Sequence, residues 1–84
     1  MTNKEILKKQ IIYRSMHRGT KEMDLLLGSF VKKYIDVLDI IELKDLEKLL
    51  LIEDETISKW YFKINSNDSI PNTKVSLMLK KFKL

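Results

Sequence analysis

The stretch HRGTKEMDLLLGSF, residues 17–30, constrains the fold most, because a helix break leads directly into the cleanest helical pattern of the chain. Gly19 interrupts the preceding segment, since glycine adopts backbone conformations that other residues avoid. The sequence then predicts a helix over residues 20–35, with Thr20 as its N-cap. Its apolar residues recur at spacings of three and four and share one face, and they are Met23, Leu27, Phe30, Val31 and Tyr34.

The opposite face of this predicted helix has a mixed chemistry. At about 100° per residue it carries Arg18, Glu22, Leu25 and Ser29. An apolar residue surrounded by charges is typical of the centre of an interface, so this face is a candidate docking surface. The alternative is that Gly19 only ends a helix and that Arg18 and Glu22 form an exposed ion pair, worth a few tenths of a kcal/mol.

Four other segments show helical spacing of apolar residues, and no strand pattern competes with them. They cover about 3–16, 40–51, 55–63 and 73–83. In the first of them the apolar residues surround much of the axis, so we expect more than one side to be covered, by the chain itself or by a partner. Loop residues occupy 63–72. The chain is therefore expected to form one domain, residues 1–84, that is all-α: a small compact bundle of about five short helices.

Polar residues at the starts of these segments predict how the helices begin. Thr2 or Asn3 can cap the first segment, and Asp54 can cap the fourth. Asp39 and Glu42 have the spacing of a capping box before the third.

Three single residues carry further expectations. Gly28 lies inside the second helix at a cost of about 1 kcal/mol relative to alanine, so we expect it at a contact with another helix. Trp60 is expected in the core rather than in a ligand site. His17 is either a helix C-terminal cap, which the helix dipole favours, or a polar contact in an interface.

Composition excludes several classes of site. The chain has no cysteine, which excludes disulfides and thiolate zinc sites and suits a reducing compartment such as a cytoplasm. It has one histidine and two glycines, so neither a metal site nor a glycine-rich phosphate loop is expected. No apolar run of membrane-spanning length and no export signal is present. Since every motif of catalysis is missing, we do not expect an enzyme.

The net charge is +4, with lysines concentrated near both ends and acidic residues in the middle. Such ends are either a solvated surface or a binding site for nucleic acid or an acidic partner.

The block from Tyr13 to Phe30 resembles the small flavinylation factors that assist the assembly of succinate dehydrogenase. The signature of that family is Arg-Gly-x-x-Glu, matched here by Arg18, Gly19 and Glu22. An aspartate usually follows, at the position of Asp24. A leucine pair, an acidic turn and a tryptophan further along also match the family, so the similarity spans nearly the whole chain.

This resemblance implies a five-helix assembly chaperone of the bacterial cytoplasm that is a monomer and has no cofactor of its own. The implied partner is the flavoprotein subunit of succinate dehydrogenase, or that of fumarate reductase. The chaperone would promote covalent attachment of FAD to a histidine of that subunit. The residues expected to bind the partner are Arg14, His17, Arg18, Gly19, Glu22, Asp24 and Leu25.

Two other functions compete with this interpretation. A small basic helical domain could bind nucleic acid as a helix-turn-helix, but Glu22 and Asp24 would repel phosphate, so no nucleic acid is expected. A generic adaptor would use the same docking face and would have no effect on flavin.

Overall fold

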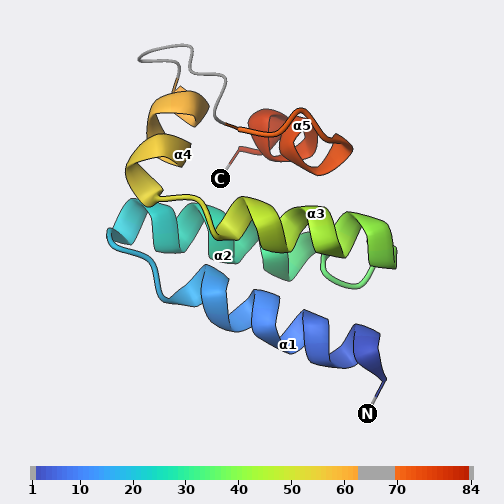
Figure 1. Ribbon diagram of the computed structural model, residues 1–84. Coiled ribbons are helices and arrows are strands. Elements are labelled where there is room, and N and C mark those ends of the chain that lie inside the picture. The colour runs from blue at the N-terminus through green and yellow to red at the C-terminus, as the bar shows by residue number, and fades with distance from the viewer. Residues whose placement is uncertain (1, 63–69, 84) are drawn as a thin grey trace.

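The computed structural model describes residues 2–62 and 70–83, and these residues form five helices (Figure 1). The helices are α1 (Asn3–Met16), α2 (Lys21–Tyr34), α3 (Ile40–Leu50), α4 (Asp54–Phe62) and α5 (Lys74–Lys81). The all-α prediction is confirmed, and the predicted bounds agree to within one or two residues. The predicted loop over 63–72 and the predicted end of the fourth helix at residue 63 lie largely outside the described residues.

Helices α2 and α3 run across the middle of the molecule in Figure 1, between α1 below and α4 and α5 above. Helix α1 packs against both of them, and α5 packs on α3 from the other side. Helix α2 contributes most to the core, with five buried side chains, namely Met23, Leu26, Leu27, Phe30 and Val31. None of the helices within 2–62 and 70–83 has both the length and the apolar character needed to cross a bilayer.

Local hydrogen bonds fix the starts of α1 and α3 as the sequence predicted. The Thr2 hydroxyl accepts the Glu5 N–H at 3.2 Å, so Thr2 rather than Asn3 is the cap of α1. Both bonds of the predicted capping box are present, with Asp39 and Glu42 exchanging contacts of 2.8 and 2.9 Å. These caps satisfy backbone donors that have no partner inside their own helix.

Helix α1 is covered on one side only by the described part of the chain. Its buried residues are Leu7, Ile11 and Ser15. Its other large apolar side chains, Ile6, Ile12, Tyr13 and Met16, are between 39% and 65% exposed. The expectation that a second side of this helix is covered is therefore not met by the chain itself, and an apolar face remains open.

Trp60 packs against the core without being enclosed by it, so the expectation for this residue holds only in part. The ammonium group of Lys80 lies over its ring, 4.7 Å from the centroid, and also donates a hydrogen bond to the Trp60 carbonyl. A cation over an indole face stabilises a tryptophan that remains at the protein surface.

Gly28 lies at a contact between two helices, as predicted. A Cβ atom added to Gly28 would meet the Ser15 carbonyl oxygen of α1 at 3.9 Å, which is ordinary van der Waals contact. The helix contact therefore has room for a methyl group, and close packing does not require glycine here.

We predict that Gly28→Ala raises the free energy of unfolding by up to about 1 kcal/mol, because alanine restricts the unfolded chain and favours the helix. Urea unfolding of the variant beside the wild type measures this difference. A less stable variant would mean that the two helices approach more closely than the 3.9 Å separation indicates.

Stability should also depend on pH through Glu42. Two contacts hold the pKa of Glu42 below its ordinary value of 4.5. The larger effect comes from the hydrogen bond that its carboxylate accepts from the Asp39 N–H, and the next from the ammonium group of Lys74 at 3.1 Å. The stabilisation is therefore complete above pH 4.5 and is lost as the pH falls through the lower folded-state pKa. Thermal unfolding of wild type and Glu42→Gln from pH 7 to about pH 3 should show their difference in Tm shrinking in acid. A difference that is constant across this range would contradict the assignment.

Candidate functional site

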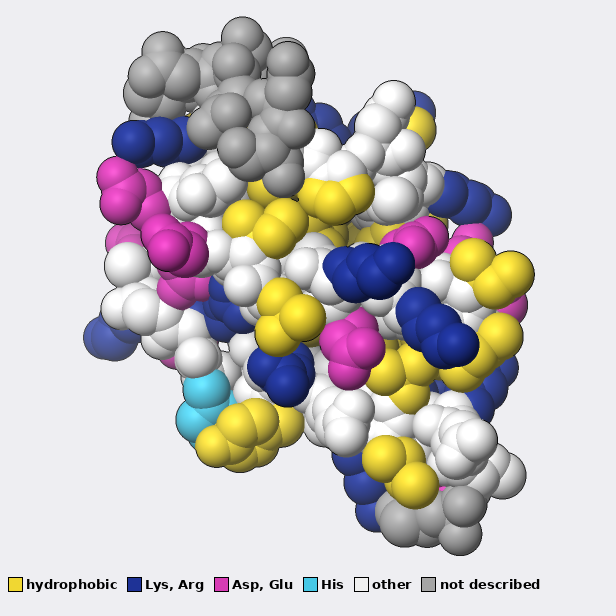
Figure 2. Space-filling view, viewed as in Figure 1, with side chains coloured by type: hydrophobic (Ala, Val, Ile, Leu, Met, Phe, Trp, Pro, Cys, Tyr) yellow, Lys and Arg dark blue, Asp and Glu magenta, His cyan; other side chains and the backbone are white. Residues whose placement is uncertain are grey.

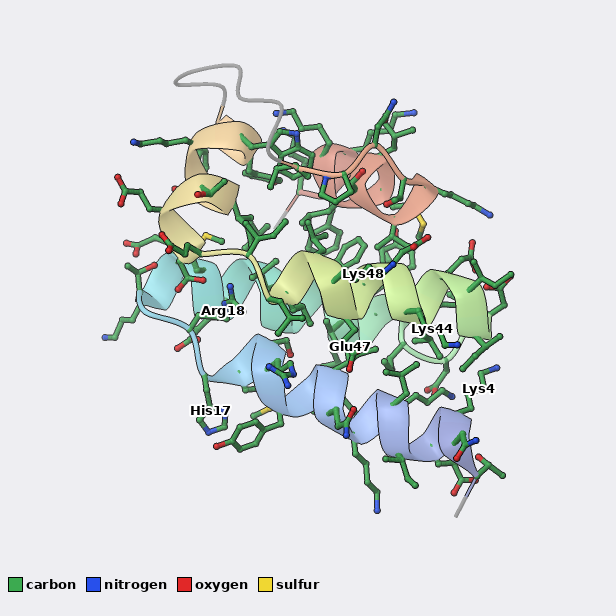
Figure 3. All side chains as sticks on the ribbon, in the orientation of Figure 1. Lys4, His17, Arg18, Lys44, Glu47 and Lys48 are labelled. Carbon is green, nitrogen blue, oxygen red and sulfur yellow. The ribbon has the colours of Figure 1, made fainter. Side chains whose placement is uncertain are left out.

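The Arg18 side chain extends from the connection between α1 and α2 toward the place where α3 meets α4 (Figure 3). There its guanidinium group pairs with Asp54, with Nη2 at 2.5 Å and Nε at 2.6 Å from Oδ1. The side chains are only 8% and 18% exposed. This pair, which we call the Arg18–Asp54 junction, is therefore largely screened from water.

The same guanidinium group also satisfies the end of α3. Nη1 donates to the Leu50 carbonyl at 2.6 Å, and Nη2 donates to the Ile52 carbonyl at 3.0 Å. Carbonyls at a helix C-terminus have no partner within the helix, and a cation is favourable there. Arg18 thus caps α3 while its charge is balanced by Asp54.

Gly19 lies against the other oxygen of the Asp54 carboxylate. Its backbone N–H donates to Oδ2, and a Cβ atom at Gly19 would lie 3.0 Å from that oxygen. The φ angle of Gly19 is not in the left-handed region, so the expected conformational reason for glycine is wrong. A side chain here would be tight against that oxygen, so the carboxylate that Arg18 holds would have to shift by a few tenths of an ångström.

Asp54 does not cap α4, which corrects the sequence prediction. It is the first residue of that helix, and its carboxylate is used by Arg18 and Gly19 instead. A carboxylate beside a helix N-terminus remains favourable for the helix dipole even when its hydrogen bonds go elsewhere.

The turn that follows is held from its other side by Asp24. The Asp24 carboxylate accepts the Arg18 N–H at 2.6 Å, and the Thr20 hydroxyl accepts the Met23 N–H at 3.2 Å, which confirms Thr20 as the N-cap. The start of α2 is therefore held by the Thr20 cap, and Asp24 holds the backbone of Arg18 just before it.

Glu22 is exposed, and no described residue holds its carboxylate in an ion pair or hydrogen bond. The alternative in which Glu22 pairs with Arg18 is wrong, because Arg18 reaches the less exposed Asp54. Glu22 borders a depression of about 360 Å³ between α2 and α4. Leu25, one turn further along α2, is 60% exposed. Glu22 and Leu25 form the outward part of the site, and we call them the docking surface.

His17 ends α1 as its C-cap, one of the two expectations for this residue. Nδ1 lies 2.8 Å from the Tyr13 carbonyl, which can only accept, so Nδ1 carries the hydrogen. The ring stacks on Tyr13 at a centroid distance of 4.1 Å, and Tyr13, Arg14 and His17 are all exposed. Figures 2 and 3 show His17 at the surface, at the end of α1. The capping role leaves the other ring nitrogen open to a partner.

The arrangement offers recognition by shape and charge. Across the described residues, histidine and the acidic residues form no group of three that could hold a metal ion. The site instead has a rigid base, the Arg18–Asp54 junction, and an outward surface bearing a free carboxylate and an apolar side chain.

A family model described as flavinator of succinate dehydrogenase matches residues 9–83. The chain belongs to this family. The matched region includes every residue of the Arg18–Asp54 junction and of the docking surface.

Individual relatives agree with this assignment. A protein of Acetobacter pasteurianus named FAD assembly factor SdhE is 32% identical over 74 residues, which cover 88% of this chain and 65% of the relative. A protein of Lodderomyces elongisporus named succinate dehydrogenase assembly factor 2, mitochondrial, is 32% identical over 81 residues, covering 92% and 49%. A protein of Dictyostelium discoideum with the same name is 42% identical over 59 residues, covering 70% and 42%. The chain thus spans 65% or less of the length of each of these relatives. No solved structure matches it.

Sequence reasoning missed Asp54 as a residue of this site. The family pattern pointed to an acidic turn at this position, but the helix pattern assigned it to a cap. The sequence did contain a signal for a more distant partner of Arg18. Glu22 follows Arg18 along the chain, and a cation that precedes a carboxylate on a helix makes the weaker ion pair.

We predict that Asp54→Ala lowers the free energy of unfolding by about 3 kcal/mol, because it leaves the Arg18 charge buried without a partner. The neighbouring carboxylate provides a matched control. Glu55 is 74% exposed and pairs with Lys59 on the same helix, so Glu55→Ala should cost less than about 0.5 kcal/mol. Urea unfolding measures both, and equal losses would contradict a buried, stabilising junction.

Proposed function

We propose that this chain is an assembly factor that binds the flavoprotein subunit of succinate dehydrogenase and promotes covalent attachment of FAD to it. The family match over residues 9–83 supports this function, as do the names of the relatives. The observation that carries it in the structure is the free Glu22 carboxylate, displayed on a turn that the Arg18–Asp54 junction holds rigid.

The residues of the partner-binding site divide into two groups under this proposal. Glu22 and Leu25 contact the flavoprotein directly, with His17 and Arg14 at the edge of the contact. Arg18, Gly19 and Asp24 hold the turn in position, since their polar groups are engaged within the chain.

The mechanism uses no catalytic residue of this chain. The docking surface binds the flavoprotein and stabilises a conformation in which the flavin and its acceptor histidine are aligned. Holding two reacting groups in the right geometry can lower a barrier by several kcal/mol. The FAD belongs to the partner, and this chain acts as a monomer in the bacterial cytoplasm, without an enzymatic activity of its own.

Nucleic-acid binding is not favoured by the site. The first turn of α2 would have to enter a groove of the duplex, and it carries Glu22 and Asp24. Carboxylates at this place would face the phosphates of the backbone.

We predict that Glu22→Ala lowers the rate of flavinylation by about tenfold or more, the loss expected for one hydrogen bond to a charged group. The helical fold should be unchanged, because the Glu22 carboxylate makes no hydrogen bond or ion pair with any described residue. The assay combines the purified flavoprotein subunit with FAD and reads covalent flavin by fluorescence in a denaturing gel.

Glu5→Ala is the matched control, since Glu5 is also an exposed carboxylate in the first turn after a threonine cap. It should flavinylate at the wild-type rate. Normal flavinylation by Glu22→Ala would show that this carboxylate is not the functional group.

A further inference from the structure

A groove of about 610 Å³ runs between α1 and α2, beside the docking surface. Its apolar wall consists of side chains that the described chain leaves uncovered, with Ile12 39%, Met16 60% and Leu25 60% exposed. Gly28 forms part of the same wall and adds no side chain to it on the α2 side. Ile12 and Met16 belong to the open apolar face of α1 noted above, so the groove joins part of that face to α2.

The groove is continuous with the docking surface because Leu25 belongs to both. A specific interface buries roughly 800 Å² on each partner, which one carboxylate and one leucine cannot supply. The groove is the adjoining surface that can provide the remaining apolar area, since apolar residues dominate the energy at interface centres.

Some charged side chains around the groove have partners within the chain, and others have none among the described residues. The Asp24 carboxylate already accepts the Arg18 N–H, and Asp36 pairs with Lys8 at 3.1 Å. Lys32 lines the groove and Lys21 lines the adjoining depression around Leu25, and neither makes an ion pair with any described residue. These two lysines are therefore available to pair with carboxylates of a partner.

We propose that this groove binds an apolar segment of the flavoprotein that is flanked by carboxylates, an inference that rests on the proposed function. The apolar side chains of that segment cover Ile12 and Met16, and its carboxylates pair with Lys21 and Lys32. A second copy of this chain fits less well, because it would bring the same unpaired lysines and a net charge of +4 to the contact.

The test measures the Kd of labelled wild type and variants for the purified flavoprotein subunit by fluorescence anisotropy. The double variant Ile12→Gln/Met16→Gln should bind about tenfold or more weakly, as for interface residues of moderate importance. Lys32→Glu should also weaken binding and change its dependence on salt, since it reverses a charge at the rim. Circular dichroism checks that each variant keeps its helices.

Matched controls lie on α5, away from the groove. Leu77 is 53% exposed and Lys81 is exposed, so Leu77→Gln and Lys81→Glu remove the same kinds of side chain and should bind as wild type does. Wild-type affinity in the Ile12→Gln/Met16→Gln variant, with Glu22→Ala still impaired, would overturn the groove proposal and leave the proposed function intact. A wild type that does not bind the flavoprotein would overturn both. Groove variants that abolish a wild-type dimer, measured by sedimentation, while binding the flavoprotein normally, would assign the groove to a second copy.

Discussion

The ion pair between Arg18 and Asp54 connects four helix ends at one point. Arg18 lies between α1 and α2, and its guanidinium group caps α3. Its partner, Asp54, is the first residue of α4. A buried ion pair is favourable only when additional hydrogen bonds satisfy both groups, because taking two charges out of water costs several kcal/mol. The carbonyls of Leu50 and Ile52 and the N–H of Gly19 provide those bonds. An 84-residue chain with a small core depends heavily on one such contact.

The residues of the short Arg-Gly-x-x-Glu pattern have two different roles around this ion pair. The arginine and the glycine face inward onto one carboxylate, and the glycine leaves the space which that carboxylate occupies. Thr20 then starts α2 in a fixed direction. Glu22 is consequently displayed at a defined place on the surface, without a partner in the described chain that would compete for it. A carboxylate on a rigid turn suits a docking surface, because little conformational entropy of the turn is then lost on binding.

The helices could be predicted from the sequence because their signals are local. Apolar spacing and caps such as Thr20 and Asp39 act within three or four residues, so the helix bounds and these two caps agree with the structure. The Arg18–Asp54 junction could not be predicted in this way, because its members are 36 residues apart and only folding brings them together. Local spacing instead offered Glu22 as the partner of Arg18 and a cap as the role of Asp54, and both were wrong. The exposure of one side of α1 likewise depends on which faces the other helices cover.

In the proposed complex, the start of α2 and the groove beside α1 together form the surface that binds the flavoprotein. Hydrogen–deuterium exchange of this chain, alone and mixed with the purified flavoprotein subunit, would locate that surface. We expect slower exchange on binding in peptides covering residues 12–36, with little change in peptides covering α5. Protection confined to α5 and the lysines near the C-terminus, with residues 12–36 exchanging as in the free protein, would contradict it.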